Sequence, residues 1–414
     1  MDVDAGIRER PRDVGHSARL VVNLGDDRLA FDVPIAAVVE DSPGRVVVGR
    51  RHDHVAAITQ AAAADCAQVD AIRGQRLGKD RHRAGRVPEL YDELVAHPAN
   101  RTRGAARPIA RYDPLVPIDE REHTLLISAT EADLPSPVAA ALRAPSKGLP
   151  GVVRDGGIPW ATASWGDPTD PPLLLIHGVT SAAGIFWRVA PALAAGGRRV
   201  LTIDLPGHGD TGTWRGRHQF ADTADDLAGF IHAAGLDVPD LAVLGHSWGG
   251  MVVAGLPRAG VIPRTLILLD PPALAREALE YMTRDPTEGS YDSLDEARSA
   301  VRAGNPSWSD GDIEAKAVGL TKFDVDGALA ILLDNGEWDA GLTALAHPRA
   351  AEIPIWYIRG EHRTGGLIPE TFVPALAARV GPDHVLTIAG GPHSPMRTHP
   401  EATVLAILRA VRGG

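Results

Sequence analysis

Cysteine is nearly absent from this sequence: Cys66 is the single cysteine among 414 residues, so an internal disulfide framework is excluded. Long hydrophobic runs are also absent. With no stretch of 18 apolar residues and no apolar core close to residue 1, neither a transmembrane helix nor a secretory signal is predicted. By default, these absences indicate a cytoplasmic protein without a membrane span.

An excess of basic residues is missing as well. The net charge is −11, and an acidic chain repels phosphate backbones, so no nucleic-acid partner is expected. No P-loop is present, so the sequence does not imply a nucleotide. His52, Asp53, His54 and His82 suggest a metal only weakly, because their spacing is irregular and no cysteine is near; a solvated loop is favoured. We expect a small-molecule substrate, no metal and no cofactor.

Tryptophan is absent before Trp160, and this divides the chain. Residues 1–125 carry 19 Lys and Arg against 20 Asp and Glu, with three aromatic residues, whereas the remainder carries 23 against 33, with 16 aromatic residues. Core-forming content is therefore concentrated in the later part. We expect residues 1–125 to be a disordered or loosely structured N-terminal extension. The alternatives are a small regulatory or partner-binding module, or a segment added by a start codon placed too far upstream.

Residues 1–125 nevertheless hold a few local signals. Strand-like pieces occur at 20–24 and 29–33, and an alanine-rich stretch at 55–72 is compatible with a helix.

From residue 149 the sequence pattern becomes regular. Short apolar runs typical of buried strands alternate with helical stretches at 183–195, 220–234 and 248–256. The expected strands are 151–155, 158–164, 173–176, 199–204, 241–244, 266–270, 353–358 and 384–388. This alternation predicts an α/β fold, a doubly wound and mostly parallel sheet of eight strands with helices on both faces.

About 80 residues interrupt the alternation of strands and helices. Between 273 and 351 the sequence favours helices, at about 273–282, 293–303, 310–319 and 325–335. An insertion after the sixth strand's carboxyl end lies over the edge where open α/β sheets bind ligands, so we expect a helical cap. The predicted organisation is an extension at 1–125, a connection at 126–148 and an α/β domain at 149–414.

A nucleophile motif follows the strand predicted at 241–244. Residues 245–249 read G-x-S-x-G, with Ser247 at a sharp turn and a helix immediately behind it. The flanking glycines allow two backbones to approach closely, and the N-terminus of the helix favours developing negative charge. A serine hydroxyl is a poor nucleophile at neutral pH and needs a base within hydrogen-bond reach. The motif therefore makes Ser247 the candidate nucleophile.

Residues 149–412 resemble the α/β-hydrolase family in four motifs that occur in the same order. His177 and Gly178 follow the third strand, residues 204–211 match a D-x-x-G-x-G-x-[ST] turn, and the serine motif follows the fifth strand. Residues 390–395 resemble the family's terminal histidine loop. The resemblance implies that His393 is the base for Ser247. It also implies that the oxyanion hole consists of the backbone N–H groups of Val179 and Trp248.

The sequence departs from the usual family pattern at the acid of the triad. The family usually places an Asp three residues after the glycine that ends the seventh strand; that glycine is Gly360 here, and the position holds Arg363. A minority of the family takes the acid from the end of the sixth strand, where Asp270 stands. Glu361 is the alternative. Either choice preserves the order Ser, acid, His.

The resemblance implies a serine hydrolase that cleaves a carboxylic ester, or a lactone, thioester or amide, of a small to medium substrate. Ser at the elbow argues against the epoxide hydrolase and haloalkane dehalogenase branches, which use Asp there. The alternatives are a C–C bond hydrolase or a cofactor-free perhydrolase on the same residues. A third possibility is a non-catalytic binding protein of the same fold.

Overall fold

The computed structural model describes residues 123–212, 218–284 and 288–413, together with the backbone of four strands between residues 17 and 48. The chain divides into two compact units, 1–85 and 86–414. In the first unit, β1 (Ser17–Leu24) pairs antiparallel with β2 (Asp27–Pro34), in agreement with the two predicted strands, and β3 (Val38–Glu40) pairs with β4 (Val46–Val48).

Three features of the N-terminal sequence lie outside the described residues. They are the helix predicted at 55–72, the histidine group at 52–82 and Cys66.

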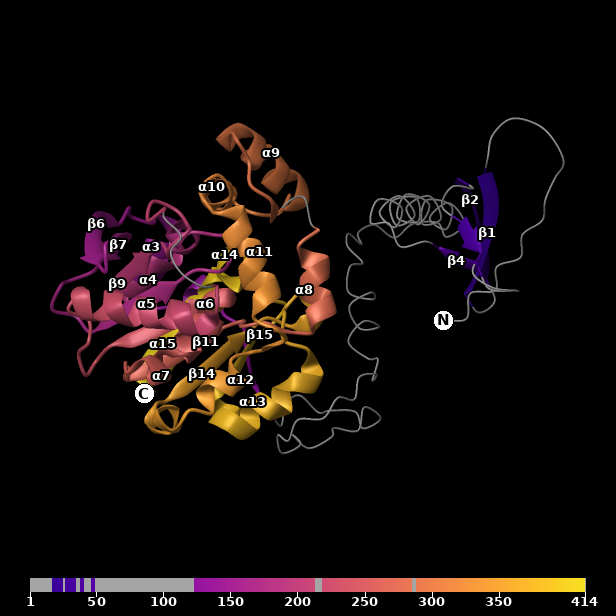
Figure 1. Cartoon of the computed structure of the whole chain (residues 1–414). Helices are drawn as coiled ribbons and strands as arrows, with labels where there is room; N and C mark the ends of the chain where they lie inside the picture. The colour runs from indigo at the N-terminus through magenta and orange to yellow at the C-terminus, as the bar shows by residue number, and fades with distance from the viewer. Residues whose placement is uncertain are drawn as a thin grey trace. The chain divides into compact units, whose positions relative to one another are not determined.

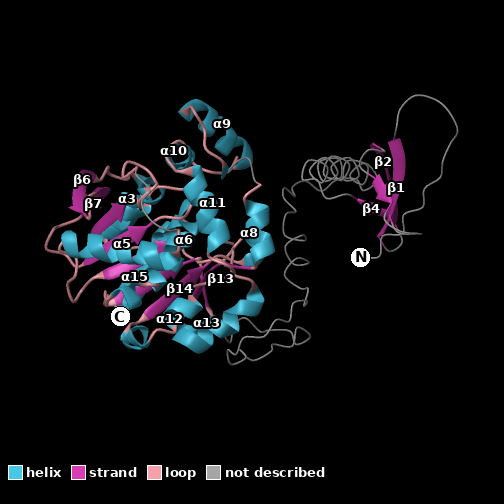
Figure 2. Ribbon diagram, in the orientation of Figure 1, coloured by secondary structure: helices cyan, strands magenta, loops and turns pink. Residues whose placement is uncertain are grey.

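The second unit is built on one nine-stranded sheet, in the order β5-β15-β14-β11-β10-β8-β9-β7-β6 (Figures 1 and 2). Its strands are β5 (Leu125–Ile127), β6 (Leu149–Asp155), β7 (Ile158–Trp165), β8 (Pro172–Ile176), β9 (Arg199–Ile203), β10 (Ala242–His246), β11 (Thr265–Leu269), β14 (Ile355–Arg359) and β15 (Val385–Ile388). All neighbours pair in parallel except β6 with β7 and β7 with β9. The predicted mostly parallel α/β fold is confirmed.

The sheet has one strand more than predicted. The additional strand, β5, pairs in parallel with β15 at one edge. It has only three residues, too few to show a periodic pattern. The sequence predicts the adjoining residues 126–148 to be a connection. The helix α3 (Ser136–Arg143) in that segment instead buries Val138 and Leu142 in the core of the domain. Residues 126–148 are therefore part of the folded unit.

The strands bury residues on both faces, which explains their continuous apolar sequences. The helices that cover the two faces of the sheet are α4 (Val189–Ala195), α5 (Phe220–Ala233), α6 (Trp248–Ala254), α7 (Leu256–Ala259), α13 (Val373–Val380), α14 (Pro395–Thr398) and α15 (Pro400–Arg412). Leu173 and Leu175 of β8 face a cluster covered by α3, α4 and α15, whereas Leu174 and Ile176 face a second cluster covered by α5, α6 and α13.

A helical insertion separates β11 from β14, as the sequence predicts (Figure 1). It comprises α8 (Arg276–Met282), α9 (Leu294–Gly304), α10 (Asp310–Leu320), α11 (Val325–Asp334) and the short α12 (Leu342–Leu345). Side chains of Ser293, Ser309 and Asp324 accept the N-terminal N–H groups of α9, α10 and α11, which defines where each helix begins. The pair β12 (Ala273–Leu274) and β13 (Trp338–Asp339) closes the base of the insertion.

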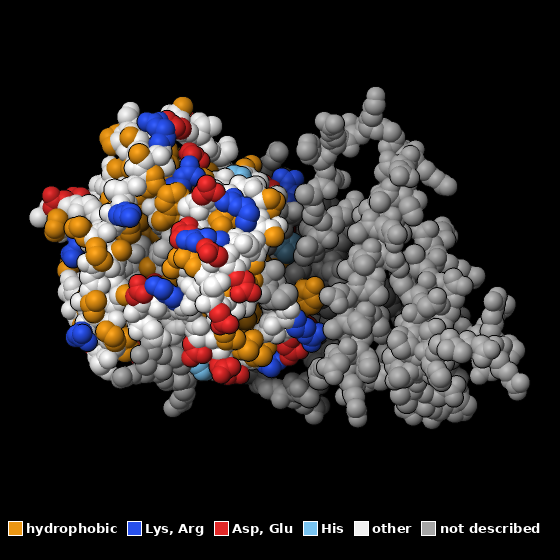
Figure 3. Space-filling model, turned by 90° about the horizontal axis from the view of Figure 1, so that it is seen from above, with side chains coloured by type: hydrophobic (Ala, Val, Ile, Leu, Met, Phe, Trp, Pro, Cys, Tyr) orange, Lys and Arg blue, Asp and Glu red, His pale blue; other side chains and the backbone are white. Residues whose placement is uncertain are grey.

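The surface of this unit mixes charges of both signs. On the face shown in Figure 3, Lys and Arg side chains lie beside Asp and Glu side chains. The ion pair of Arg276 with Glu280 is one example of a pair whose side chains are about half exposed. Exposed pairs of this kind add little to stability. Among the described residues, no helix is both long and apolar enough to span a bilayer.

Candidate active site

Ser247 stands between β10 and α6 in a strained backbone conformation, with φ 56° and ψ −126°. The close approach of backbones explains the glycines on either side. A Cβ on Gly245 would lie 2.1 Å from the carbonyl oxygen of Gly249, and a Cβ on Gly249 would lie 2.5 Å from that of His177. The turn therefore admits no side chain at these two positions and holds a serine at its apex.

His393 lies in the loop after β15, and its Nδ1 donates a hydrogen bond of 2.7 Å to Oδ2 of Asp270. Asp270 follows β11, is fully buried and has a positive φ of 43°. Ser247, Asp270 and His393 each follow the carboxyl end of a parallel strand, so they share the edge of the sheet where open α/β folds bind ligands. A donating Nδ1 leaves Nε2 of His393 as the proton-accepting nitrogen.

Glu361 has a different partner. Its carboxylate pairs with the guanidinium of Arg363, which lowers the pKa of that carboxyl group. Its backbone N–H donates to the carbonyl oxygen of Gly391 at 2.8 Å. Of the two acids considered from the sequence, Asp270 contacts His393 and Glu361 contacts Arg363.

Val179 and Trp248 lie on the two segments that flank Ser247. A Cβ on Gly178 would lie 3.0 Å from Cβ and 3.4 Å from Oγ of Ser247, so the loop after β8 runs directly against the nucleophile. Val179 follows in that loop, and Trp248 is the first residue of α6. Both backbones therefore lie beside Ser247, where donors to an oxyanion are required.

His177 and His208 hold this loop in place. Nε2 of His208 donates to the carbonyl oxygen of Val179 at 2.5 Å, and Nε2 of His177 accepts the N–H of Leu205 at 3.0 Å. Burial lowers the pKa of each imidazole to about 4, so both are neutral near pH 7. The two histidines therefore position the loop through hydrogen bonds.

His246 makes a contact that the sequence pattern does not predict. Its Nε2 donates to the carbonyl oxygen of His393 at 2.9 Å, and the two rings lie 4.8 Å apart. Burial lowers the pKa of His246 well below its usual value, so it is a neutral donor. Its place immediately before the nucleophile was the available signal, because a side chain there points away from Ser247 and toward the neighbouring loop.

A second unpredicted group joins the helical insertion to the loop after β8. Lys316 of α10 donates to the backbone oxygen of Thr180 at 2.8 Å and to its Oγ1 at 2.9 Å, and it pairs with Glu288 at 2.5 Å. Thr180 also donates to Glu288. Nothing in the local sequence pattern links residues separated by more than 100 positions.

No set of three or more His, Cys, Asp or Glu side chains suited to a metal ion occurs in the part of the chain that the structure describes.

Comparison with known proteins identifies the family. A model described as "Alpha/beta hydrolase family" matches residues 173–407. The chain is 29% identical over 261 residues to the magnesium-chelatase 30 kDa subunit of Rhodobacter capsulatus, covering 58% of this chain and 86% of that protein. It is 35% identical over 99 residues to a carbendazim hydrolyzing esterase of Nocardioides sp., covering 23% of this chain and 40% of the esterase.

Solved structures show the same fold. That of E-2-(acetamidomethylene)succinate hydrolase, at 19% identity, covers 64% of this chain and 99% of its own, with a TM-score of 0.54.

Proposed function

The chain belongs to the alpha/beta hydrolase family, and from that premise we propose that it is a serine hydrolase. Its substrate is a carboxylic ester of small to medium size, or a related lactone, thioester or amide. The observation that carries the proposal is the 2.7 Å hydrogen bond from His393 to the buried Asp270, on the same sheet edge as the strained Ser247. A buried carboxylate that orients an imidazole beside an activated serine is the arrangement that acyl transfer requires.

The proposed reaction proceeds in two halves. Oγ of Ser247 attacks the carbonyl carbon while Nε2 of His393 takes the hydroxyl proton, and the N–H groups of Val179 and Trp248 stabilise the oxyanion. The C–O bond to the leaving alcohol then breaks, and His393 returns the proton to that oxygen. Water attacks the acyl-enzyme with His393 again as base, which releases the acid and restores Ser247. Asp270 keeps the imidazole in the productive tautomer and stabilises its charged form.

Relatives support hydrolysis as the reaction class. They include proteins described as a carbendazim hydrolyzing esterase and a monoacylglycerol lipase, each matched over about 100 residues of this chain. The helical insertion follows β11 and so begins beside the candidate site, where it serves as a cap over the substrate in our proposal. The reaction requires no cofactor.

A fluorophosphonate probe tests this proposal because it phosphonylates only an activated serine. We expect the probe to label the peptide containing Ser247 in the wild-type chain, and labelling to abolish hydrolysis of a series of nitrophenyl esters. The Ser247→Ala variant should show neither labelling nor turnover. Folded wild-type protein that takes up no label would overturn the proposal. Formation of a peracid from acetate and hydrogen peroxide would instead identify a perhydrolase, and turnover of a vinylogous diketone a C–C hydrolase.

A second candidate is a non-catalytic role as a binding subunit. The observation that favours it is the match to the magnesium-chelatase 30 kDa subunit, which extends over 86% of that protein. The same labelling experiment separates the two candidates, because a pure binding subunit has no need of an activated Ser247.

A further inference from the structure

The loop between β14 and the short helix η8 (Glu370–Phe372) takes an unexpected part in the candidate site. In the usual family pattern this loop supplies the acid, but here Arg363 stands at that position. We propose that the ion pair of Arg359 with Glu370 fixes this loop as a cradle for Asp270, so that both are positioning residues for the triad. This inference rests on the proposed function.

The cradle consists of two backbone donors. The N–H of Gly360 donates to Oδ1 of Asp270 at 3.0 Å, and the N–H of Leu367 donates to Oδ2 at 2.9 Å. Together with Nδ1 of His393, these donors give the fully buried carboxylate three hydrogen bonds. A buried carboxylate needs such partners to remain charged, and their placement determines where it points.

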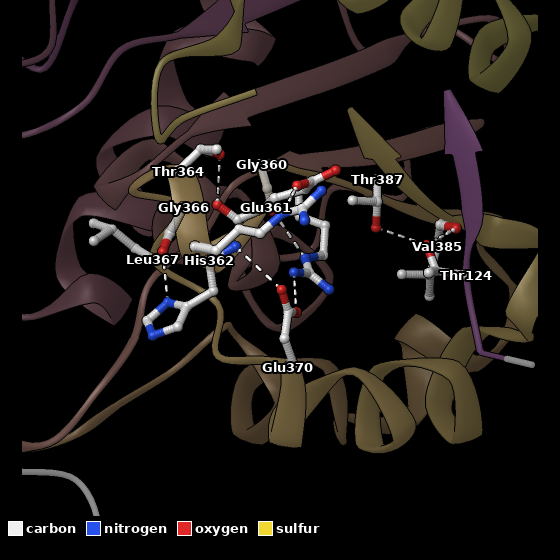
Figure 4. A network of polar contacts seen from close by, with 12 residues as sticks. Thr124, Gly360, Glu361, His362, Thr364, Gly366, Leu367, Glu370, Val385 and Thr387 are labelled. Carbon is white, nitrogen blue, oxygen red and sulfur yellow. Dashed lines mark hydrogen bonds and ion pairs between the residues drawn. The ribbon is translucent and has the colours of Figure 1, made fainter. Parts of the chain in front are cut away.

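Glu370 closes the loop from its far end (Figure 4). Its carboxylate pairs with Nη2 of Arg359, the last residue of β14, and its Oε1 accepts the N–H of His362 at 3.2 Å. Arg359 is fully buried, and its Nε donates to the carbonyl oxygen of Gly360 at 3.0 Å. The ion pair therefore connects the two ends of the loop. Arg359 immediately precedes the donor Gly360, and Glu370 follows the donor Leu367.

The same loop also holds the base. The N–H of His393 donates to the carbonyl oxygen of Gly365 at 3.1 Å, and Oγ1 of Thr364 donates to that of Gly391 at 2.8 Å. A Cβ on Gly360 would lie 2.5 Å from the carbonyl oxygens of Gly391 and Pro392, so the two loops are in direct contact. The loop therefore positions the carboxylate of Asp270 through its own backbone N–H groups. It positions His393 through a hydrogen bond with the backbone N–H of that residue.

The substitution Glu370→Gln isolates the ion pair, because it preserves the size of the side chain and removes its charge. Loosening the cradle should weaken the hydrogen bond between Asp270 and His393. We expect kcat to fall about tenfold with KM within about twofold, because the loss affects transition-state stabilisation. Glu370→Asp, which retains the charge, should lose less.

A double-mutant cycle with Asp270→Asn distinguishes positioning from general destabilisation. If Glu370 acts through Asp270, Glu370→Gln should change the rate less than about twofold in the Asp270→Asn background. An equal loss in both backgrounds, or no loss in the wild-type background, would overturn the inference. Arg363→Gln is the matched control, since Arg363 is on the same loop, its side chain is 80% exposed and it contacts Glu361. It should leave the rate unchanged.

A readout independent of turnover keeps this test separate from that of the proposed function. The proton on Nδ1 of His393, shared with Asp270, should give a low-field NMR resonance in the wild-type chain that moves upfield in Glu370→Gln. An unchanged resonance would overturn the inference even if wild-type Ser247 reacts with fluorophosphonate. Absence of that reaction would overturn the proposed function while the resonance still reports on the cradle.

Discussion

Asp270 and His393 are separated by 123 positions in the sequence, yet Oδ2 of one lies 2.7 Å from Nδ1 of the other. Parallel pairing produces this contact. β11 and β15 flank β14, so residues that follow all three strands meet at one sheet edge. The positive φ of Asp270 turns the chain immediately after β11. The carboxylate then contacts His393 in the loop after β15.

The first prediction concerns the choice of acid. Asp270→Asn should lower kcat/KM by about 10³- to 10⁴-fold, because an amide in place of the carboxylate favours the wrong tautomer of His393. Glu361→Gln should change it less than about threefold, since Glu361 pairs with Arg363. Kinetics with a nitrophenyl ester would measure both. Full activity in Asp270→Asn would show that the acid assignment is wrong.

Much of the fold was predictable because most of its parallel strands are continuous apolar runs that alternate with helical stretches. The α/β class, the parallel strands from β8 onward and the helical insertion follow from those patterns. β5 escaped prediction because three residues carry no periodicity, and it forms an edge only by pairing with β15, over 250 positions away.

The site was predictable to the extent that it rests on local motifs. Ser247 occupies a G-x-S-x-G turn that short-range sterics determine, and His393 follows a family pattern. The choice between Asp270 and Glu361 depended on contacts between loops, which no local pattern specifies. The hydrogen bonds from His246 to the carbonyl oxygen of His393 and from Lys316 to that of Thr180 likewise join distant parts of the chain. The position of His246 indicates the direction of its side chain, but no local pattern specifies the partner of either residue.

The second prediction concerns strain at the nucleophile. With φ at 56°, Ser247 occupies a region that glycine adopts more readily than residues with a Cβ. Ser247→Gly and Ser247→Ala should both abolish turnover, but the glycine variant should be more stable by about 1 kcal/mol, after allowance for its greater chain entropy when unfolded. Calorimetry of the two variants measures the difference. An alanine variant as stable as the glycine variant would contradict stored strain at this turn.

The third prediction concerns stability at mildly acid pH. Burial lowers the pKa of His208 from 6.5 to about 4. Between those values the unfolded chain binds a proton that the folded chain does not, so stability falls as pH falls from about 6.5 toward 4. For this imidazole the loss between pH 7 and pH 5 is about 2 kcal/mol.

Replacing His208 provides the test. His208→Gln removes the titrating group, so the destabilisation caused by the substitution should be about 2 kcal/mol smaller at pH 5 than at pH 7. Urea unfolding of wild type and variant at both pH values measures this difference. An equal effect at the two pH values would contradict the neutral, buried state of His208.

The fourth prediction concerns the contact between the helical insertion and the loop that carries Val179. Lys316 of α10 donates to the backbone oxygen and Oγ1 of Thr180, and its side chain is only 9% exposed. Its ammonium also pairs with Glu288. Leaving a buried acceptor without its donor costs about 1–3 kcal/mol of folding stability. Because Lys316 belongs to α10 and Thr180 to the loop, the contact links the packing of the insertion to the position of the loop.

Lys316→Met keeps the apolar stem of the side chain and removes its three donors. We expect a loss of about 1–3 kcal/mol in stability and a fall in kcat, because the loop that carries Val179, the proposed oxyanion donor, is then held less firmly. Lys322→Met is the matched control: Lys322 is partly exposed and pairs with Asp210, so its loss should cost less than about 1 kcal/mol. Thermal unfolding and ester kinetics give both quantities. If Lys316→Met retained wild-type kcat while losing stability, Lys316 would anchor the insertion without acting on the loop that carries Val179.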